Sequence, residues 1–376
     1  MGRIGSIDAL RGVVMVIMLL DHIRETFYLH KQVADPVDVT TTEPELFFIR
    51  FLSSICAPVF VLLTGMGAWL HGRSHSRAET SAFLLKRGLL LILLEVTVIN
   101  FSWTGQFPPT TIFLQVIWVI GLAMIALAGL LYMPRLPLLA LSAILIAGHH
   151  FLEPVSFATG SPWYPIWSVL YDRNWIEISD TMRARTSYPL LPWIGVIALG
   201  YGIGPWFSAD VEPSIRIRKL TFAGLSALAA FAAIRWLNVY GDAPRLTGVD
   251  AGTAMMSFFS LTKYPPSLLF NLSTLGLGAL LLAWFERLGD NPSLTRLSVF
   301  GAAPMFFYIL HLYVLKVIYV ICVVLFGANQ GSYFGLPSVL TLVPVFIILP
   351  AVFYFPTSWF SRLKRRRRDI AWLKYL

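Results

Sequence analysis

The chain has 376 residues, of which 57% are hydrophobic and 13% charged, and its mean hydropathy is +0.70. This composition excludes a soluble globular protein, so the sequence predicts an integral membrane protein surrounded by a lipid bilayer. The net charge is +9, and a basic run after the last apolar segment contributes much of it: Arg362, Lys364, Arg365, Arg366, Arg367 and Arg368. Anionic lipid head groups are the expected partner of this run, and no nucleic acid is expected.

Ten apolar segments have a length suited to crossing a bilayer, because a helix of about 20 residues spans the hydrocarbon core. They lie at 7–28, 46–71, 83–101, 111–132, 136–152, 188–207, 219–239, 265–285, 299–326 and 337–360. Helices satisfy their own backbone hydrogen bonds, which lipid cannot do. We therefore predict an all-α polytopic membrane protein of about ten transmembrane helices, forming one domain over residues 1–376.

Basic residues in the loops predict the orientation. With the amino terminus in the cytoplasm, every basic cluster of the loops and the basic tail fall on the cytoplasmic side, so both termini are predicted to be cytoplasmic. Two long connections, 153–187 and 240–264, are then extracytoplasmic, and such loops often carry function. The first apolar run has no small-residue cleavage site after it, so it is expected to be a retained helix, which suits a bacterial inner membrane.

The first predicted span is the richest in ionisable residues, which are costly in a membrane and therefore candidates for function. It contains Asp8, Arg11, Asp21, His22 and Arg24. At 100° per residue, Arg11 and His22 lie within about 20° of each other and about 16 Å apart along the helix axis. Asp8 shares their face. Asp21 and Arg24 share another face, where we expect them to form an ion pair near the outer end of the helix. Both are also candidates for a contact to substrate or for support of the site.

These residue types suit two different tasks. An arginine suits a phosphate-bearing or thioester-bearing cofactor, because its guanidinium is always charged and offers a planar set of donors. A histidine suits proton transfer near neutral pH and can act as a general base. Spacing alone leaves a second interpretation open, in which Asp8 and Arg11 anchor the helix at the interface and His22 makes an interhelical hydrogen bond.

The first span reads Ser6-Ile7-Asp8-Ala9-Leu10-Arg11-Gly12, and ten residues separate Arg11 from His22. This string resembles the bacterial membrane family related to heparan-alpha-glucosaminide N-acetyltransferase, and the spacing is similar to that of the acyltransferase-three family. Both belong to the proposed transmembrane acyltransferase superfamily. The resemblance continues at Cys56-Ala57-Pro58-Val59-Phe60, 188–195, 263–268 and 306–311.

The resemblance implies a membrane-bound acyltransferase. Such proteins take an acyl group, usually acetyl, from cytoplasmic acyl-CoA and deliver it to an acceptor across the membrane, often a carbohydrate or glycolipid. It implies that Arg11, with Asp8, helps bind acetyl-CoA or another acyl-CoA, and that His22 is the catalytic base; no metal is expected. In the lysosomal enzyme the catalytic histidine lies in the first luminal loop, whereas 31–45 has none here. This departure favours His22 and leaves an amino-sugar acceptor unsupported.

Other residues are candidates for substrate or supporting contacts. His311, with Tyr308 one turn before it, could be a second base, a cofactor contact or a packed core histidine. Lys263 and Tyr264 could hold an anionic acceptor or anchor the chain at lipid head groups. Arg50 could contact substrate or anchor the second span.

The competing hypothesis is a membrane transporter or lipid flippase. Many transporters carry matching broken helices in two halves, and the sequence has no such pairing. The ionisable residues also gather on one helix, which favours a reaction over alternating access. The sequence does not predict the oligomeric state.

Overall fold

The structure is a computed structural model that describes residues 5–367, 369–370 and 373. Arg368 of the basic tail lies outside these residues. The chain divides into two compact units. Unit 1 comprises Met1–Cys56, Pro244–Ser260 and Leu277–Leu376, and unit 2 comprises Ala57–Ala243 and Leu261–Gly276.

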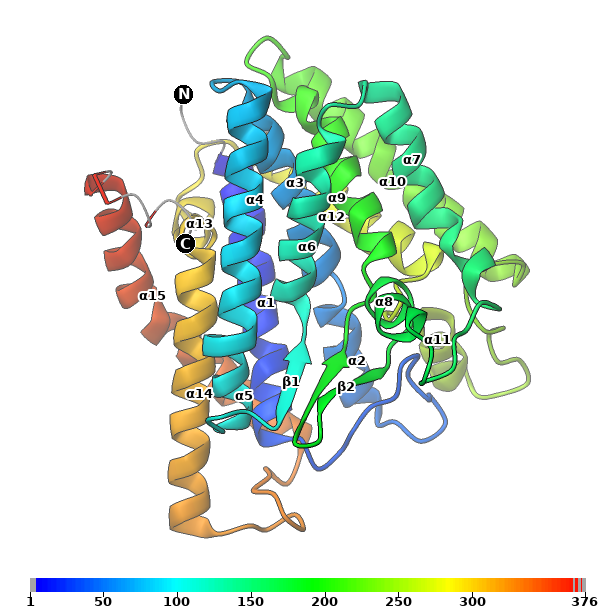
Figure 1. Cartoon of the computed structure of the whole chain (residues 1–376), viewed down its shortest axis with the longest axis vertical. Helices are drawn as coiled ribbons and strands as arrows, with labels where there is room; N and C mark the ends of the chain where they lie inside the picture. The colour runs from blue at the N-terminus through cyan, green and yellow to red at the C-terminus, as the bar shows by residue number, and fades with distance from the viewer. Residues whose placement is uncertain (1–4, 368, 371–372, 374–376) are drawn as a thin grey trace. The chain divides into compact units, whose positions relative to one another are not determined.

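Unit 1 is built around its first helix (Figure 1). Its elements are α1 (Gly5–Phe27), α2 (Pro44–Ser53), α11 (Ala251–Phe259), α13 (Pro292–Ala302), α14 (Pro304–Phe326), the short turn η4 (Val339–Thr341) and α15 (Leu342–Arg366). Helix α12 (Leu268–Leu288) begins in unit 2 and ends in unit 1. Helix α1 packs against α2, α13, α14 and α15. Its buried apolar side chains include Leu10, Val14, Met15, Leu19 and Ile23.

Unit 2 combines helices with a small sheet. Its helices are α3 (Cys56–Gly72), α4 (Arg77–Leu94), η1 (Glu95–Ile99), α5 (Asn100–Thr104), α6 (Val116–Leu130), α7 (Arg135–Ala147), η2 (His149–Leu152), α8 (Trp163–Leu170), α9 (Leu191–Ile203), η3 (Gly204–Phe207) and α10 (Pro213–Leu237). Its strands are β1 (Thr111–Leu114), β2 (Trp175–Ser179) and β3 (Met182–Thr186). The strand order is β1-β3-β2, with β1 parallel and β2 antiparallel to β3.

The chain is mostly helical, but the prediction of a helix from the start of 111–132 is wrong, because this segment begins with β1. Asn100 explains the extended backbone there. Its side-chain amide donates to the Thr111 carbonyl at 2.9 Å, and its side-chain oxygen accepts from the Phe113 N–H at 3.0 Å. These bonds replace the backbone bonds that a helix would supply. The long connection 153–187 is also partly structured, since it contains α8, β2 and β3.

Two segments predicted as single helices are interrupted. The segment 299–326 breaks between Ala302 and Pro304. A proline has no N–H to continue the helix and pushes the residue before it out of the helical region, and Ala303 accordingly has φ −136° and ψ 57°. The segment 46–71 is likewise divided between α2 and α3.

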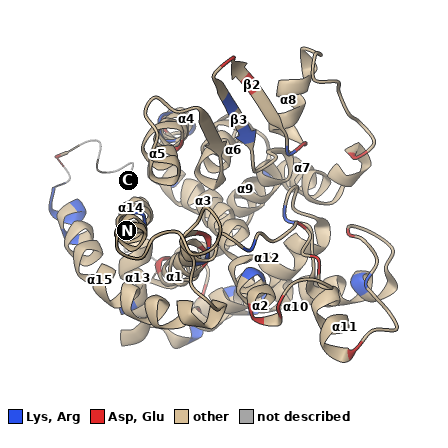
Figure 2. Cartoon of the chain, turned by 90° about the horizontal axis from the view of Figure 1, so that it is seen from below, with Lys and Arg blue, Asp and Glu red and all other residues tan. Residues whose placement is uncertain are grey.

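Five stretches in the described part of the chain are long and apolar enough to cross a membrane. They are Pro44–Gly72, Pro213–Leu237, Leu268–Leu288, Pro304–Phe326 and Val339–Arg366. Three shorter apolar helices are Val116–Leu130, Arg135–Ala147 and Leu191–Phe207. The chain is therefore an integral membrane protein; ten spans and cytoplasmic termini stay predictions. The last turn of α15 contains Lys364, Arg365 and Arg366, and Figure 2 shows blue on this helix.

Helices α1 and α13 touch through their backbones. A Cβ atom on Gly12 would lie 2.0 Å from the Leu297 carbonyl oxygen, and a Cβ atom on Gly301 would lie 1.9 Å from the Asp8 carbonyl oxygen. Glycine at both positions removes the side chain that would hold the helices apart. This close approach positions the charged end of α1 against the last turn of α13.

Candidate active site

At the beginning of α1, Arg11 is held by two oxygens within unit 1. Its Nη1 donates to Asp8 Oδ1 at 3.0 Å and to the Gly301 carbonyl at 3.4 Å. The Gly301 carbonyl lies in the last turn of α13, where carbonyl oxygens carry partial negative charge. Ser6, one turn earlier, donates to Glu286. The Arg11 side chain remains 19% exposed, so its guanidinium lies at the edge of this cluster rather than inside it.

About one and a half turns from the other end of α1, His22 faces a second histidine. His22 Nδ1 lies 2.7 Å from His311 Nε2 of α14, and the two rings stack with centroids 5.0 Å apart. The Tyr308 ring meets both imidazoles edge-on, with centroids 5.5 Å from each. His311 is fully buried and His22 is 7% exposed. The structure thus brings together three of the residues predicted from sequence, His22, Tyr308 and His311, from two helices.

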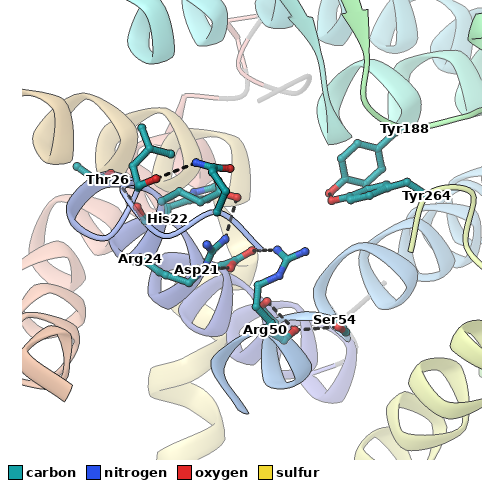
Figure 3. A network of polar contacts seen from close by, with 12 residues as sticks. Asp21, His22, Arg24, Thr26, Arg50, Ser54, Tyr188 and Tyr264 are labelled. Carbon is teal, nitrogen blue, oxygen red and sulfur yellow. Dashed lines mark hydrogen bonds and ion pairs between the residues drawn. The ribbon is translucent and has the colours of Figure 1, made fainter. Parts of the chain in front are cut away.

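The ion pair predicted from helical spacing is present beside His22 (Figure 3). Arg24 Nε donates to Asp21 Oδ1 at 3.0 Å, and Arg24 Nη2 also donates to Glu25 at 3.0 Å. The second oxygen of Asp21 lies 3.8 Å from Arg50 Nη1 of α2. Asp21 therefore bridges two arginines and ties α2 to α1. In this position, all three charges serve to fix the end of α1 that carries His22.

Lys263 and Tyr264 lie in unit 2, in the segment before α12. The Tyr264 hydroxyl donates to the Tyr188 hydroxyl at 3.1 Å (Figure 3). The Lys263 ammonium lies 5.2 Å and the Arg173 guanidinium 4.6 Å from the centre of the Tyr264 ring. Both cations lie within cation–π distance of the Tyr264 ring, and these contacts stabilise the segment.

Arginine–aromatic stacking recurs on the sheet of unit 2. The guanidinium of Arg183 lies 4.1 Å and that of Arg185 5.2 Å from the centre of the Trp175 ring. Both arginines belong to β3, and Figure 2 shows blue on this strand. The register places Glu177 opposite Arg183, so the face carries both signs of charge. This pattern indicates a sheet face organised by stacking.

The segment that carries Lys263 is held from several sides. His149 bonds to the Pro266 carbonyl at 3.0 Å, and Asp242 accepts from Ser267 Oγ at 2.6 Å and from Thr262 N–H at 2.7 Å. Burial raises the pKa of the Asp242 carboxyl, although the hydrogen bonds from Ser267 and Thr262 oppose the shift. His149 therefore has a structural partner in unit 2.

The family model described as "Heparan-alpha-glucosaminide N-acetyltransferase, catalytic" matches residues 3–241, more than half of the chain. The chain belongs to this family. No curated protein matches the chain.

Membership of the heparan-alpha-glucosaminide N-acetyltransferase family makes the chain a membrane protein of an acetyltransferase family and implies transferase activity. The matched range includes Asp8, Arg11 and His22. His311 and Lys263 lie beyond its end. Within the described residues there is no group of three or more His, Cys, Asp or Glu side chains that could hold a metal ion.

Sequence reasoning missed the backbone partners of the site. Arg11 donates to the Gly301 carbonyl, and His311 Nδ1 lies 2.7 Å from the Phe307 carbonyl. Hydropathy does not reveal contacts to backbone carbonyls of this kind. Gly12 ends the string Ser6–Gly12. A glycine inside a helix allows the backbone of another helix to approach closely, and this is the signal in the sequence that points to a partner helix.

Proposed function

We propose that the chain is an acyl-CoA-dependent acyltransferase that transfers an acyl group, most simply acetyl, to an extracytoplasmic carbohydrate or glycolipid. His22 acts as the general base, and Arg11, supported by Asp8, binds the anionic part of the donor. The observation that carries the proposal is the hydrogen bond of 2.7 Å between His311 of α14 and His22, which lies on α1 together with Arg11.

Arg11 is suited to the donor by its position. Its hydrogen bonds to Asp8 and to the Gly301 carbonyl are both made by Nη1, and the side chain is partly exposed. A guanidinium carries five N–H donors in a planar arrangement that matches phosphate oxygens. Asp8 and the carbonyl of Gly301 orient the group, so little side-chain entropy remains to be lost on binding.

The reaction needs one group that accepts a proton and returns it. Acyl-CoA supplies a thioester carbonyl as the electrophile. His22 takes the proton of the acceptor hydroxyl or amine while the acceptor atom bonds to the acyl carbon and the carbon–sulfur bond breaks. His22 then gives that proton to the departing thiolate, so the products are the acylated acceptor and the free thiol of CoA. We propose direct transfer, because binding both substrates together supplies the required orientation.

Binding of the donor is testable without knowing the acceptor. We expect acetyl-CoA to raise the apparent melting temperature of the detergent-purified protein, since a ligand of the folded state at about 100 times its Kd adds about 2.7 kcal/mol to the free energy of unfolding. Arg11→Ala should lose most of this increase, and Arg183→Ala of β3 should keep it. Each variant is compared with itself with and without ligand, so a change in basal stability does not affect the result.

The test also separates the two functional classes. An equal increase in wild type and Arg11→Ala would overturn the role of Arg11, and no increase with any acyl-CoA would favour the transporter or flippase hypothesis. A transporter would instead respond to its transported solute or lipid.

A further inference from the structure

A chain of two hydrogen bonds fixes where the protons of the histidine pair reside. His311 Nδ1 lies 2.7 Å from the carbonyl oxygen of Phe307, one turn earlier on α14. A carbonyl oxygen can only accept, so His311 Nδ1 must carry the hydrogen. In a neutral imidazole the other nitrogen then has a lone pair. His311 Nε2 is therefore an acceptor.

The same logic extends to His22. Its Nδ1 lies 2.7 Å from His311 Nε2, and that bond needs one donor. Because His311 Nε2 accepts, His22 Nδ1 must be the donor. A neutral His22 is thus protonated on Nδ1, and its lone pair is on Nε2.

A charged His311 would reverse this assignment, but its surroundings oppose a charge. Its side chain is fully buried, with Phe307 and Tyr308 rings 5.0 and 5.5 Å from its own. Within the described residues no carboxylate forms an ion pair with His311. A buried charge without a partner is strongly unfavourable, so the neutral form is retained.

We infer that His311 is a positioning residue, which holds His22 in the Nδ1-protonated tautomer so that Nε2 is the nitrogen that takes the proton of the acceptor. The inference rests on the proposed function of His22, but the tautomer itself does not. When Nε2 takes up the proton, the Nδ1–H of the resulting imidazolium still donates to the neutral His311. Two hydrogen bonds then connect the His22 ring, the His311 ring and the Phe307 carbonyl in one chain.

His22 and His311 resemble a catalytic histidine base and the carboxylate that commonly orients such a base, but the orienting group here is a neutral imidazole. An orienting carboxylate brings a full negative charge, whereas His311 is a neutral acceptor and stabilises the imidazolium less. A neutral partner suits a buried position in a membrane, where an unpaired carboxylate would be costly whenever His22 is neutral. His311 thus orients the base without adding a permanent charge.

Nitrogen-15 NMR measures the tautomer directly. The protein has seven histidines, and the signals of His22 are identified by their loss in His22→Gln. We expect the N–H proton of His22 to be attached to Nδ1 in wild type. In His311→Leu it should move to Nε2, because the acceptor is gone. A wild-type His22 protonated on Nε2 would overturn the inference.

The kinetics of His311 variants provide a second test of its positioning role. His311→Leu should lower kcat by about 10- to 100-fold with little change in KM for acetyl-CoA, because base catalysis is impaired while donor binding is not. His311→Gln supplies an amide oxygen as acceptor and should recover a large part of the rate. Equal rates in His311→Leu and wild type, or a His311→Gln as slow as His311→Leu although both fold, would contradict a positioning role. Full activity of His22→Ala would instead refute the proposed function, while the NMR reading still tests the tautomer.

Discussion

Replacing His22 by alanine should lower the rate of acyl transfer by about 100- to 10,000-fold, which is the usual contribution of a general base. The KM for acetyl-CoA should change little, because Arg11 and not His22 is assigned to the donor. The rate is measured as release of CoA thiol from acetyl-CoA in the presence of the acceptor.

The matched control is His75→Ala. His75 is an exposed histidine between α3 and α4, in unit 2, and its replacement should leave the rate unchanged. The apparent melting temperatures of both variants show whether they are folded. A folded His22→Ala within two-fold of the wild-type rate would exclude His22 as the base.

Gly301→Ala should be among the most destabilising single-methyl changes in the chain. The added Cβ would lie 1.9 Å from the Asp8 carbonyl oxygen and 2.9 Å from the Gly12 nitrogen. These are backbone atoms of α1 and cannot rotate away, so α1 and α13 must separate. Overpacking of this kind costs about 1–3 kcal/mol and occasionally more, and for a chain of this length about 3 kcal/mol corresponds to a fall of roughly 4 °C in apparent melting temperature. As the two helices separate, the hydrogen bond from Arg11 to the Gly301 carbonyl should also weaken.

Gly129→Ala is the control for this change. Gly129 lies in α6 with nothing within 4 Å of its Cβ position. Alanine is the better helix former by roughly 0.5–1 kcal/mol, so this variant should be as stable as wild type or slightly more stable. Similar melting temperatures for Gly301→Ala and Gly129→Ala would show that the α1–α13 contact is looser than described.

The sequence predicted local features of α1 well. The Asp21–Arg24 ion pair follows from a spacing of three residues on a helix, and it is present. Asp8 and Arg11 have the same spacing and also form a pair. Such contacts depend only on helical geometry, which an apolar segment of this length makes predictable.

Contacts distant in sequence could not be predicted in the same way. His22 and His311 are 289 residues apart, and hydropathy does not say which helices are neighbours. The strand β1 was hidden for another reason, because its Thr-Ile-Phe-Leu sequence continues into an apolar helix and reads as part of it. Its partner β3 and the side chain of Asn100 are the features that keep it extended. The apolar run alone carries no information about either.

The most direct test of acyl transfer is a mass balance in proteoliposomes supplied with acetyl-CoA and a panel of carbohydrate and glycolipid acceptors. One acetylated acceptor should form for each CoA thiol released, and both products should disappear together in His22→Ala. Movement of a solute or lipid across the membrane with acetyl-CoA left intact would contradict an acyltransferase and establish a transporter.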